Sequence, residues 1–216
     1  MNDRNLQKRV EAELDWEPRI NAAEIGVSVD KGVVTLNGAV GTYAEKINAE
    51  AAAMRVKGVM GIAEDIQVRP FGDIGSSDDE IAKRARNSLE WDTMTPDKQI
   101  QVQVEKGAVT LTGEVDWDFE RTSAKRVVQH LYGVRSVVNK MTLKSRVQPE
   151  DIHRRIQDAL ERQGQINAGD VHVTVDGGKV RLDGKVEAWR DRRVIERAAW
   201  GAPGVYTVED KVVVGF

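Results

Sequence analysis

One short sequence pattern occurs three times along this chain of 216 residues. It reads Val-x-Val-x-x-Gly-x-Val-x-Leu-x-Gly-x-Val and occupies residues 27–40, 102–115 and 173–186. Within each copy, apolar residues alternate with polar ones on both sides of a short turn, which is Asp-Lys-Gly in the first copy. The pattern therefore predicts a β-hairpin with a three-residue turn in each copy.

Glycines recur at three positions of every copy: in the hairpin turn, at the end of the second strand, and after the helix that follows. Glycine tolerates positive φ angles and close backbone approaches that other residues resist, so we expect these glycines to be structural. They are Gly32, Gly38, Gly58, Gly107, Gly113, Gly133, Gly178, Gly184 and Gly204.

Helical spacing is found on both sides of each hairpin. Before the first hairpin, Leu6, Val10 and Leu14 lie four residues apart, and apolar residues occupy the matching positions of the other two copies. After the hairpins, the same reasoning predicts helices over residues 42–57, 117–132 and 188–203. Each of these segments is followed by a Gly-Val pair and a further alternating stretch, which predicts a last strand.

The predicted fold class is α+β, with three tandem αββαβ units of about 70 residues each. Because the last strand follows a crossover helix, it should run parallel to the second strand, which gives a three-stranded mixed sheet with both helices on one face. The predicted units are residues 1–70, 76–146 and 149–216.

The recurring hairpin, together with the Gly-Val opening of each last strand, resembles the BON domain, a family named for bacterial OsmY and nodulation proteins. The resemblance covers essentially the whole chain as three copies. It implies a non-enzymatic module that associates with phospholipid or membrane surfaces and serves envelope maintenance and the response to osmotic stress. Its relatives with known locations are periplasmic or outer-membrane proteins.

The amino terminus predicts a location different from that of these relatives. It is charged and helical in pattern, so it lacks the apolar core of an export signal, and the chain has no apolar run of about 20 residues that could span a membrane. There are no cysteines and hence no disulfide framework. We expect a cytoplasmic protein, with a periplasmic or envelope location as the alternative that the resemblance implies.

The sequence gives no indication of catalysis, a metal or a cofactor. The three histidines, His130, His153 and His172, occupy unrelated repeat positions and lack metal-ligand spacing. No glycine-rich phosphate loop precedes a helix, and no nucleophile recurs with a base. The formal net charge is −3, and no unit has the basic excess of a nucleic-acid-binding domain.

The candidate binding surface is the outer face of the third unit's second helix. Helical geometry places Trp189, Arg193 and Trp200 on this face, opposite the predicted core positions. Arginines also lie beside it, namely Arg190, Arg192 and Arg197. One interpretation is burial against a neighbouring unit or a second chain. The other is contact with an anionic phospholipid surface, with tryptophan at head-group depth and arginine reaching phosphate.

Further expectations concern polar and aromatic residues that recur. Trp16 and Trp91 share one repeat position after the first helix and are expected to cap the core. The arginines at positions 9, 84 and 155 are expected to pair across the two helices with acids at positions 45, 120 and 191, or to attract lipid head groups. The polar face of each hairpin is either solvated or packed on the next unit.

The leading functional hypothesis is a non-enzymatic binding module for anionic phospholipid surfaces or envelope components. The alternative hypothesis is a protein-interaction or chaperone-like scaffold that binds partner chains or forms a homo-oligomer.

Overall fold

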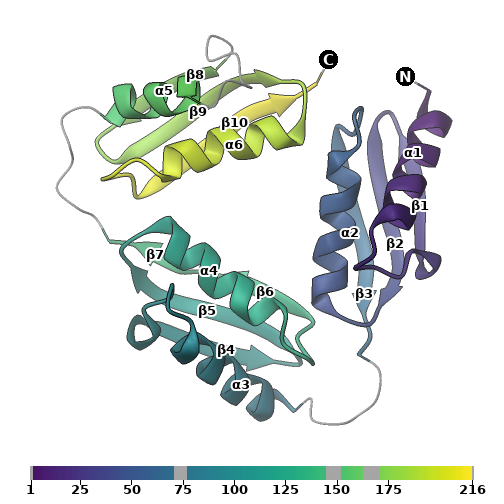
Figure 1. The fold of residues 1–216 in the computed structure, drawn as a ribbon, viewed down its shortest axis with the longest axis horizontal. Coiled ribbons are helices and arrows are strands. Elements are labelled where there is room, and N and C mark those ends of the chain that lie inside the picture. The colour runs from purple at the N-terminus through teal and green to yellow at the C-terminus, as the bar shows by residue number, and fades with distance from the viewer. Residues whose placement is uncertain (1, 71–76, 145–151, 163–170, 216) are drawn as a thin grey trace. The chain divides into compact units, whose positions relative to one another are not determined.

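A computed structural model describes residues 2–70, 77–144, 152–162 and 171–215. These residues form three αββαβ repeats, and in each repeat two helices cover one face of a small sheet (Figure 1). The predicted fold class is thereby confirmed. The predicted boundaries at residues 1, 76, 146, 149 and 216 lie outside the described residues, so the extent of each unit stays a prediction.

The first repeat follows the predicted order and adds one turn of 3₁₀ helix before the hairpin. Its elements are α1 (Asp3–Trp16), η1 (Ala22–Glu24), β1 (Ile25–Asp30), β2 (Val33–Val40), α2 (Tyr43–Arg55) and β3 (Gly61–Val68).

The second repeat has the same elements, but its last strand is interrupted. They are α3 (Asp78–Trp91), η2 (Asp97–Gln99), β4 (Ile100–Glu105), β5 (Ala108–Val115), α4 (Asp118–Gln129), β6 (Ser136–Asn139) and β7 (Thr142–Leu143). At the interruption, the Asn139 side chain accepts a hydrogen bond from the Met141 amide, while the Lys140 amide still donates to Leu111 on β5. Both strand segments therefore pair with β5.

The third repeat has a continuous last strand. Its elements are α5 (Ile152–Arg162), β8 (Val171–Asp176), β9 (Lys179–Val186), α6 (Trp189–Trp200) and β10 (Thr207–Val214).

The sheets have the mixed topology that the sequence predicts. In the first repeat β1 and β2 are antiparallel with Ile25 opposite Gly38, and β3 runs parallel to β2 after the α2 crossover. The second and third repeats have the same pairings, with Gly113 and Gly184 at the position of Gly38.

Each core lies between the two helices and the helix-facing side of the sheet. The i, i+4 spacing of the first helix buries Leu6, Val10 and Leu14 almost completely, because these side chains share one helix face. Alternation along the hairpin buries Val34 and Leu36 on the same side of the sheet. The equivalent residues are buried in the second repeat and, for the described part, in the third.

The hairpin turn is shorter than the sequence predicts. Asp30 pairs with Val33, so only Lys31 and Gly32 form the loop, and both have positive φ angles, 49° and 80°. Positive φ at both central residues is the signature of a type I′ turn, whose twist matches the flanking strands. The sequence-based expectation of a three-residue turn is therefore wrong, because the acidic residue belongs to the strand.

An aspartate at the start of the first helix holds this turn. The Asp3 carboxylate accepts hydrogen bonds from the backbone amides of Lys31 and Gly32 at 2.9 and 3.1 Å. Asp78 does the same for Lys106 and Gly107. These charge-assisted bonds tie the helix to the hairpin and offset the cost of a lysine in the left-handed region.

Candidate functional site

The predicted binding residues of α6 differ in how far they are buried: some are partly buried and others are exposed. Its inner face buries Ile195, Ala198 and Ala199. Trp189 and Trp200 are partly buried and pack against the hydrophobic core of the third repeat. Both tryptophans therefore belong in part to the fold of their own repeat, and each exposes only part of its ring.

Arg192 makes structural contacts within its repeat. Its guanidinium Nε donates to the Asp210 carboxylate at 2.7 Å, and the two side chains are 28% and 15% exposed. The guanidinium carbon also lies 5.2 Å from the centre of the Trp189 ring, within the range of a cation–π contact. At the matching positions of the first repeat, the Lys46 amine lies 3.5 Å from the Glu64 carboxylate. An ion pair between the second helix and the last strand is thus a shared feature of these two repeats.

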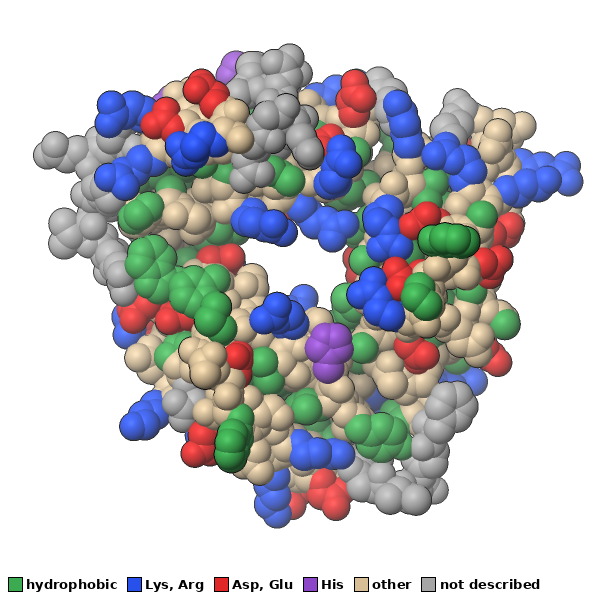
Figure 2. Space-filling model, in the orientation of Figure 1, with side chains coloured by type: hydrophobic (Ala, Val, Ile, Leu, Met, Phe, Trp, Pro, Cys, Tyr) green, Lys and Arg blue, Asp and Glu red, His purple; other side chains and the backbone are tan. Residues whose placement is uncertain are grey.

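The remaining predicted arginines, Arg190, Arg193 and Arg197, are exposed. Among the described residues, Arg190 makes only a long contact of 3.4 Å with Asp191. On the face drawn in Figure 2, basic side chains are interspersed with acidic ones, and apolar side chains reach the surface between them. The outer side of α6 therefore combines exposed guanidinium groups with partly exposed indole rings.

Trp16 and Trp91 lie on the surface, which corrects the expectation that they cap the core. They are 82% and 85% exposed, and neither ring has a hydrogen bond or a contact with another ring among the described residues. Each is the last residue of its helix, two positions after the last buried leucine. A step of two residues turns a helix by about 200°, so a side chain at this position points away from the core.

Both exposed tryptophans stand between acidic residues. Asp15 and Glu17 flank Trp16, and Glu90 and Asp92 flank Trp91. In the third repeat the matching position is Arg162. The helix spacing alone could have shown that position 16 is outside the core stripe formed by residues 6, 10 and 14.

An ion network lies at the end of α1 in the first repeat. The Glu17 side chain is only 7% exposed and accepts hydrogen bonds from Arg19 at 2.7 and 2.9 Å and from Arg55 at 3.0 Å. Arg55 also bonds Glu13 at 2.8 Å. The hydrogen bonds from Arg19, opposed by burial and assisted by Arg55, lower the pKa of Glu17 to about 2. The network joins the carboxyl ends of α1 and α2.

The expected pairing of Arg9 with Glu45 is wrong. The Arg9 guanidinium donates to the backbone carbonyl of Lys57, beyond the carboxyl end of α2. Glu45 lies in the first turn of α2, where it forms a capping box with Thr42. A helix of this length separates the two ends by about 18 Å, so Arg9 cannot reach both.

The open face of the third sheet is polar and exposed. Arg181 and Asp183, neighbours on β9, form an ion pair at 2.7 Å on this face, and hydrogen bonding by Arg181 lowers the pKa of Asp183. His172 and Thr174 on β8 are exposed beside them. For this repeat, the exposure favours the solvated interpretation of the hairpin's polar face.

The described residues also bear on two other kinds of site, a metal centre and a membrane span. Among them, no group of three or more histidine, aspartate or glutamate side chains is arranged to hold a metal ion. None of the helices within the described ranges is long and apolar enough to cross a membrane.

Comparison with known proteins places the chain in a family. It is 29% identical to the osmotically-inducible protein Y of Escherichia coli over 149 residues, which covers 67% of this chain and 74% of that protein. Two solved structures of CdsD, a structural protein of the type III secretion system of Chlamydia trachomatis, align with 18% and 17% identity. They cover 98% and 100% of this chain, and 92% and 100% of their own lengths, with TM-scores of 0.27 and 0.26. Scores this low carry no structural argument.

The family model described as BON domain matches three consecutive segments, residues 2–70, 77–145 and 149–215. The three matches follow the three αββαβ repeats of the structure. The chain therefore belongs to the BON domain family.

Proposed function

We propose that this protein is a non-enzymatic module that binds anionic phospholipid surfaces and serves the response to osmotic stress. The link to osmotic stress is supported by the similarity to osmotically-inducible protein Y. The observation that carries the lipid proposal is the outer side of α6, where Arg190, Arg193 and Arg197 are exposed beside the partly exposed rings of Trp189 and Trp200.

The physical basis is the match between this surface and a lipid head-group region. Each basic residue close to an anionic membrane contributes about 1 kcal/mol, and indole rings favour the interface between water and lipid tails. Arg192 contributes through Trp189, because its contact with that ring and with Asp210 orients the indole.

The test is flotation of the full chain with vesicles of phosphatidylcholine alone and of phosphatidylcholine mixed with phosphatidylglycerol. We expect flotation with the mixed vesicles only, weakening as salt is added. The double variant Arg193→Glu, Arg197→Glu should lose flotation, whereas Lys125→Glu, Arg126→Glu on α4, which changes the net charge equally, should retain it. Equal flotation of both variants would contradict the proposed contact surface.

Arginine variants are preferable to tryptophan variants in this test. Trp189 and Trp200 pack against the core, so replacing them changes stability together with any binding. Arg193 and Arg197 are exposed, so their replacement leaves the core intact.

A second candidate function, a protein-interaction scaffold that forms a homo-oligomer, is favoured by Trp16 and Trp91. Large exposed aromatic residues are enriched at protein interfaces, and these two repeat at one position between acidic neighbours. Light scattering of the full chain tests this function. An oligomer would exceed the monomer mass of 24.0 kDa and would dissociate in the variant Trp16→Ser, Trp91→Ser. A monomeric parent would exclude self-association through these residues.

A further inference from the structure

We infer that the groove between α5 and α6 in the third repeat is a binding site for a phosphate ester. The groove has a volume of about 400 Å³, and its floor is made of small residues at the end of α6. The lining residues are Arg155, Asp158, Ala159, Arg162, Ala198, Gly201, Ala202 and Pro203. This site lies apart from the arginines of the outer α6 side and stands independently of the proposed membrane contact.

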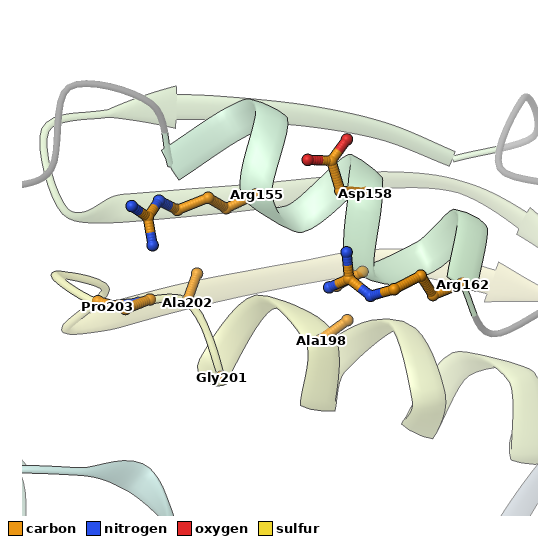
Figure 3. Close-up of a pocket in the computed structure, with 8 residues that line it drawn as sticks. Arg155, Asp158, Arg162, Ala198, Gly201, Ala202 and Pro203 are labelled. Atoms are coloured by element: carbon orange, nitrogen blue, oxygen red, sulfur yellow. The ribbon is translucent and has the colours of Figure 1, made fainter.

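Two arginines are directed toward this groove. Figure 3 shows the guanidinium groups of Arg155 and Arg162 reaching from α5 toward α6, whereas the carboxylate of Asp158 points away from α6 in this view. Within the described part of the chain, neither guanidinium has a hydrogen-bond or ion-pair partner. Seven residues separate the two, so they lie two helical turns, about 10 Å, apart along α5.

In the first repeat, side chains fill the position that corresponds to this groove. There, Arg55 on α2 bridges to Glu13 and Glu17 of α1, and this ion network occupies the junction of the two helix ends. Glu13 and Arg55 correspond to Ala159 and Gly201 in the third repeat. Removal of both side chains leaves the groove open.

The replacement of Glu13 and Arg55 by Ala159 and Gly201 also changes the charged groups at the junction of the two helices. In the first repeat Arg55 is neutralised by the chain's own carboxylates, Glu13 and Glu17. In the third repeat the arginines of the groove lie on α5 instead, at the positions of Arg9 and Trp16, and the glutamate of the bridge is an alanine. The groove thus places guanidinium groups beside a position where the first repeat has the Glu13 carboxylate and the third repeat has none.

Phosphate is an oxyanion that exposed guanidinium groups of this kind bind. Guanidinium groups donate paired hydrogen bonds to phosphate oxygens, and such charge-assisted bonds are stronger than neutral ones. The distance between Arg155 and Arg162 leaves room for an organic group between or beside them over the apolar floor of Ala198 and Ala202. A glycerol phosphate unit fits this description, and it could be a free solute or the head group of a lipid.

The experiment measures binding by the full chain in two arms. One arm titrates sn-glycerol 3-phosphate in a calorimeter, and the other uses flotation with phosphatidylcholine vesicles that contain phosphatidylglycerol. Binding in the calorimeter identifies a soluble phosphate ester, and binding to vesicles alone identifies a lipid head group. We expect Arg155→Gln, Arg162→Gln to weaken binding more than about tenfold in whichever arm shows it.

Two further variants keep the result unambiguous. Ala159→Glu, Gly201→Arg restores the first repeat's bridge and should abolish binding while the melting temperature is kept. Gly201 has a φ of −76°, which any residue adopts, and a Cβ there would lie 3.3 Å from the carbonyl oxygen of Arg197, a tight contact that a shift of a few tenths of an ångström relieves. The charge-matched control Lys125→Gln, Arg126→Gln on α4 should bind like the parent.

The inference is overturned if the parent binds in neither arm, or if both groove variants bind as the parent does. If the parent shows no binding in the calorimeter, floats with vesicles, and only the variants of Arg193 and Arg197 fail to float, the phosphate site is excluded while the proposed membrane contact stands.

Discussion

The first and third repeats have the same backbone design but use different side chains at the junction of their two helices. In the first repeat, Glu13, Glu17 and Arg55 fill the junction with an ion network. In the third repeat, Ala159 and Gly201 leave a groove. The guanidinium groups at its edge, those of Arg155 and Arg162, have no hydrogen-bond or ion-pair partner among the described residues. The comparison separates what every repeat needs in order to fold from what one repeat has available for binding.

The hairpin turns of the first and third repeats also use different residues for the same backbone reversal. Lys31 and Gly32 both have positive φ, and Asp3 holds their amides. In the third repeat the first turn residue is Gly177, with φ of 58°, and Gly178 is not in the left-handed region. Gly178 is required instead by a close approach, because a Cβ there would collide with the carbonyl of Gly204 and the ring of Tyr206.

The largest expected effect is at a glycine that recurs in all three repeats, so it tests the backbone design that they share. Gly38 has φ of 130°, and a Cβ on it would run into the carbonyl oxygen of Glu24. Gly38→Ala should lower the free energy of unfolding by about 3 kcal/mol, because backbone strain and a collision with main chain act together. Chemical denaturation followed by circular dichroism measures this change.

The control for this change is Gly61→Ala in the same repeat. Gly61 is outside the left-handed region and has only Val33 methyl groups near its Cβ position, at 3.7 Å and beyond. Its replacement should cost less than about 1 kcal/mol. Equal losses for the two variants would show that Gly38 is not held by the geometry described above.

The second test addresses the aspartate that holds the turn. Asp78→Ala removes two charge-assisted hydrogen bonds to the amides of Lys106 and Gly107 and should cost about 2 kcal/mol. Asp79 is adjacent, lies in the same first helical turn and pairs with Lys83 on the surface. Asp79→Ala should therefore cost less than about 0.5 kcal/mol in the same denaturation experiment. A reversed order would refute the role given to Asp78.

The third test compares neighbouring arginines on α6. Arg192→Ala breaks the half-buried pair with Asp210 and the contact with the Trp189 ring, so it should cost about 1 kcal/mol of unfolding free energy. Arg193→Ala should leave stability unchanged, because Arg193 is exposed. Thermal denaturation of the two single variants measures the difference. If both variants were equally stable, Arg192 would have no stabilising role and would count with Arg193 as a binding residue.

The smallest effect at neutral pH is expected at Glu17, because solvent screens its partly exposed arginine partners. Its folded-state pKa of about 2 is below its usual value of 4.5, so its contribution to stability is complete above pH 4.5 and is lost as the pH falls through 2. Glu17→Gln should therefore reduce the fall in melting temperature between pH 4.5 and 2. Glu11→Gln serves as the control, and the same acid dependence in both variants would contradict this assignment.

The fold was predictable from the sequence because it rests on patterns that recur in register. The spacing of Leu6, Val10 and Leu14 fixes a buried helix face, and alternation in the hairpin fixes the buried side of the sheet. The turn length was not predictable from composition, since a terminal strand residue and a turn residue can both be aspartate. The exposed position of Trp16 was predictable from the helix spacing, although its hydrophobicity argued for the core.

The binding features were harder to predict because they depend on which side chains are missing. The partial burial of Trp189 and the pairing of Arg192 with Asp210 require knowledge of how α6 packs on β10. The groove in the third repeat arises where Gly201 stands opposite Ala159 across two helices, and no local pattern relates these two positions.

Hydrogen–deuterium exchange of the full chain, with and without vesicles containing phosphatidylglycerol, tests the central claim that lipid binding resides in the third repeat. The shared frame gives α2, α4 and α6 the same place in their repeats, so each serves as a control for the others. Our account predicts that vesicles slow exchange in residues 189–200 and leave residues 43–55 and 118–129 unchanged. Equal protection of all three helices, or protection confined to the ends of α1 and α3 at Trp16 and Trp91, would contradict it.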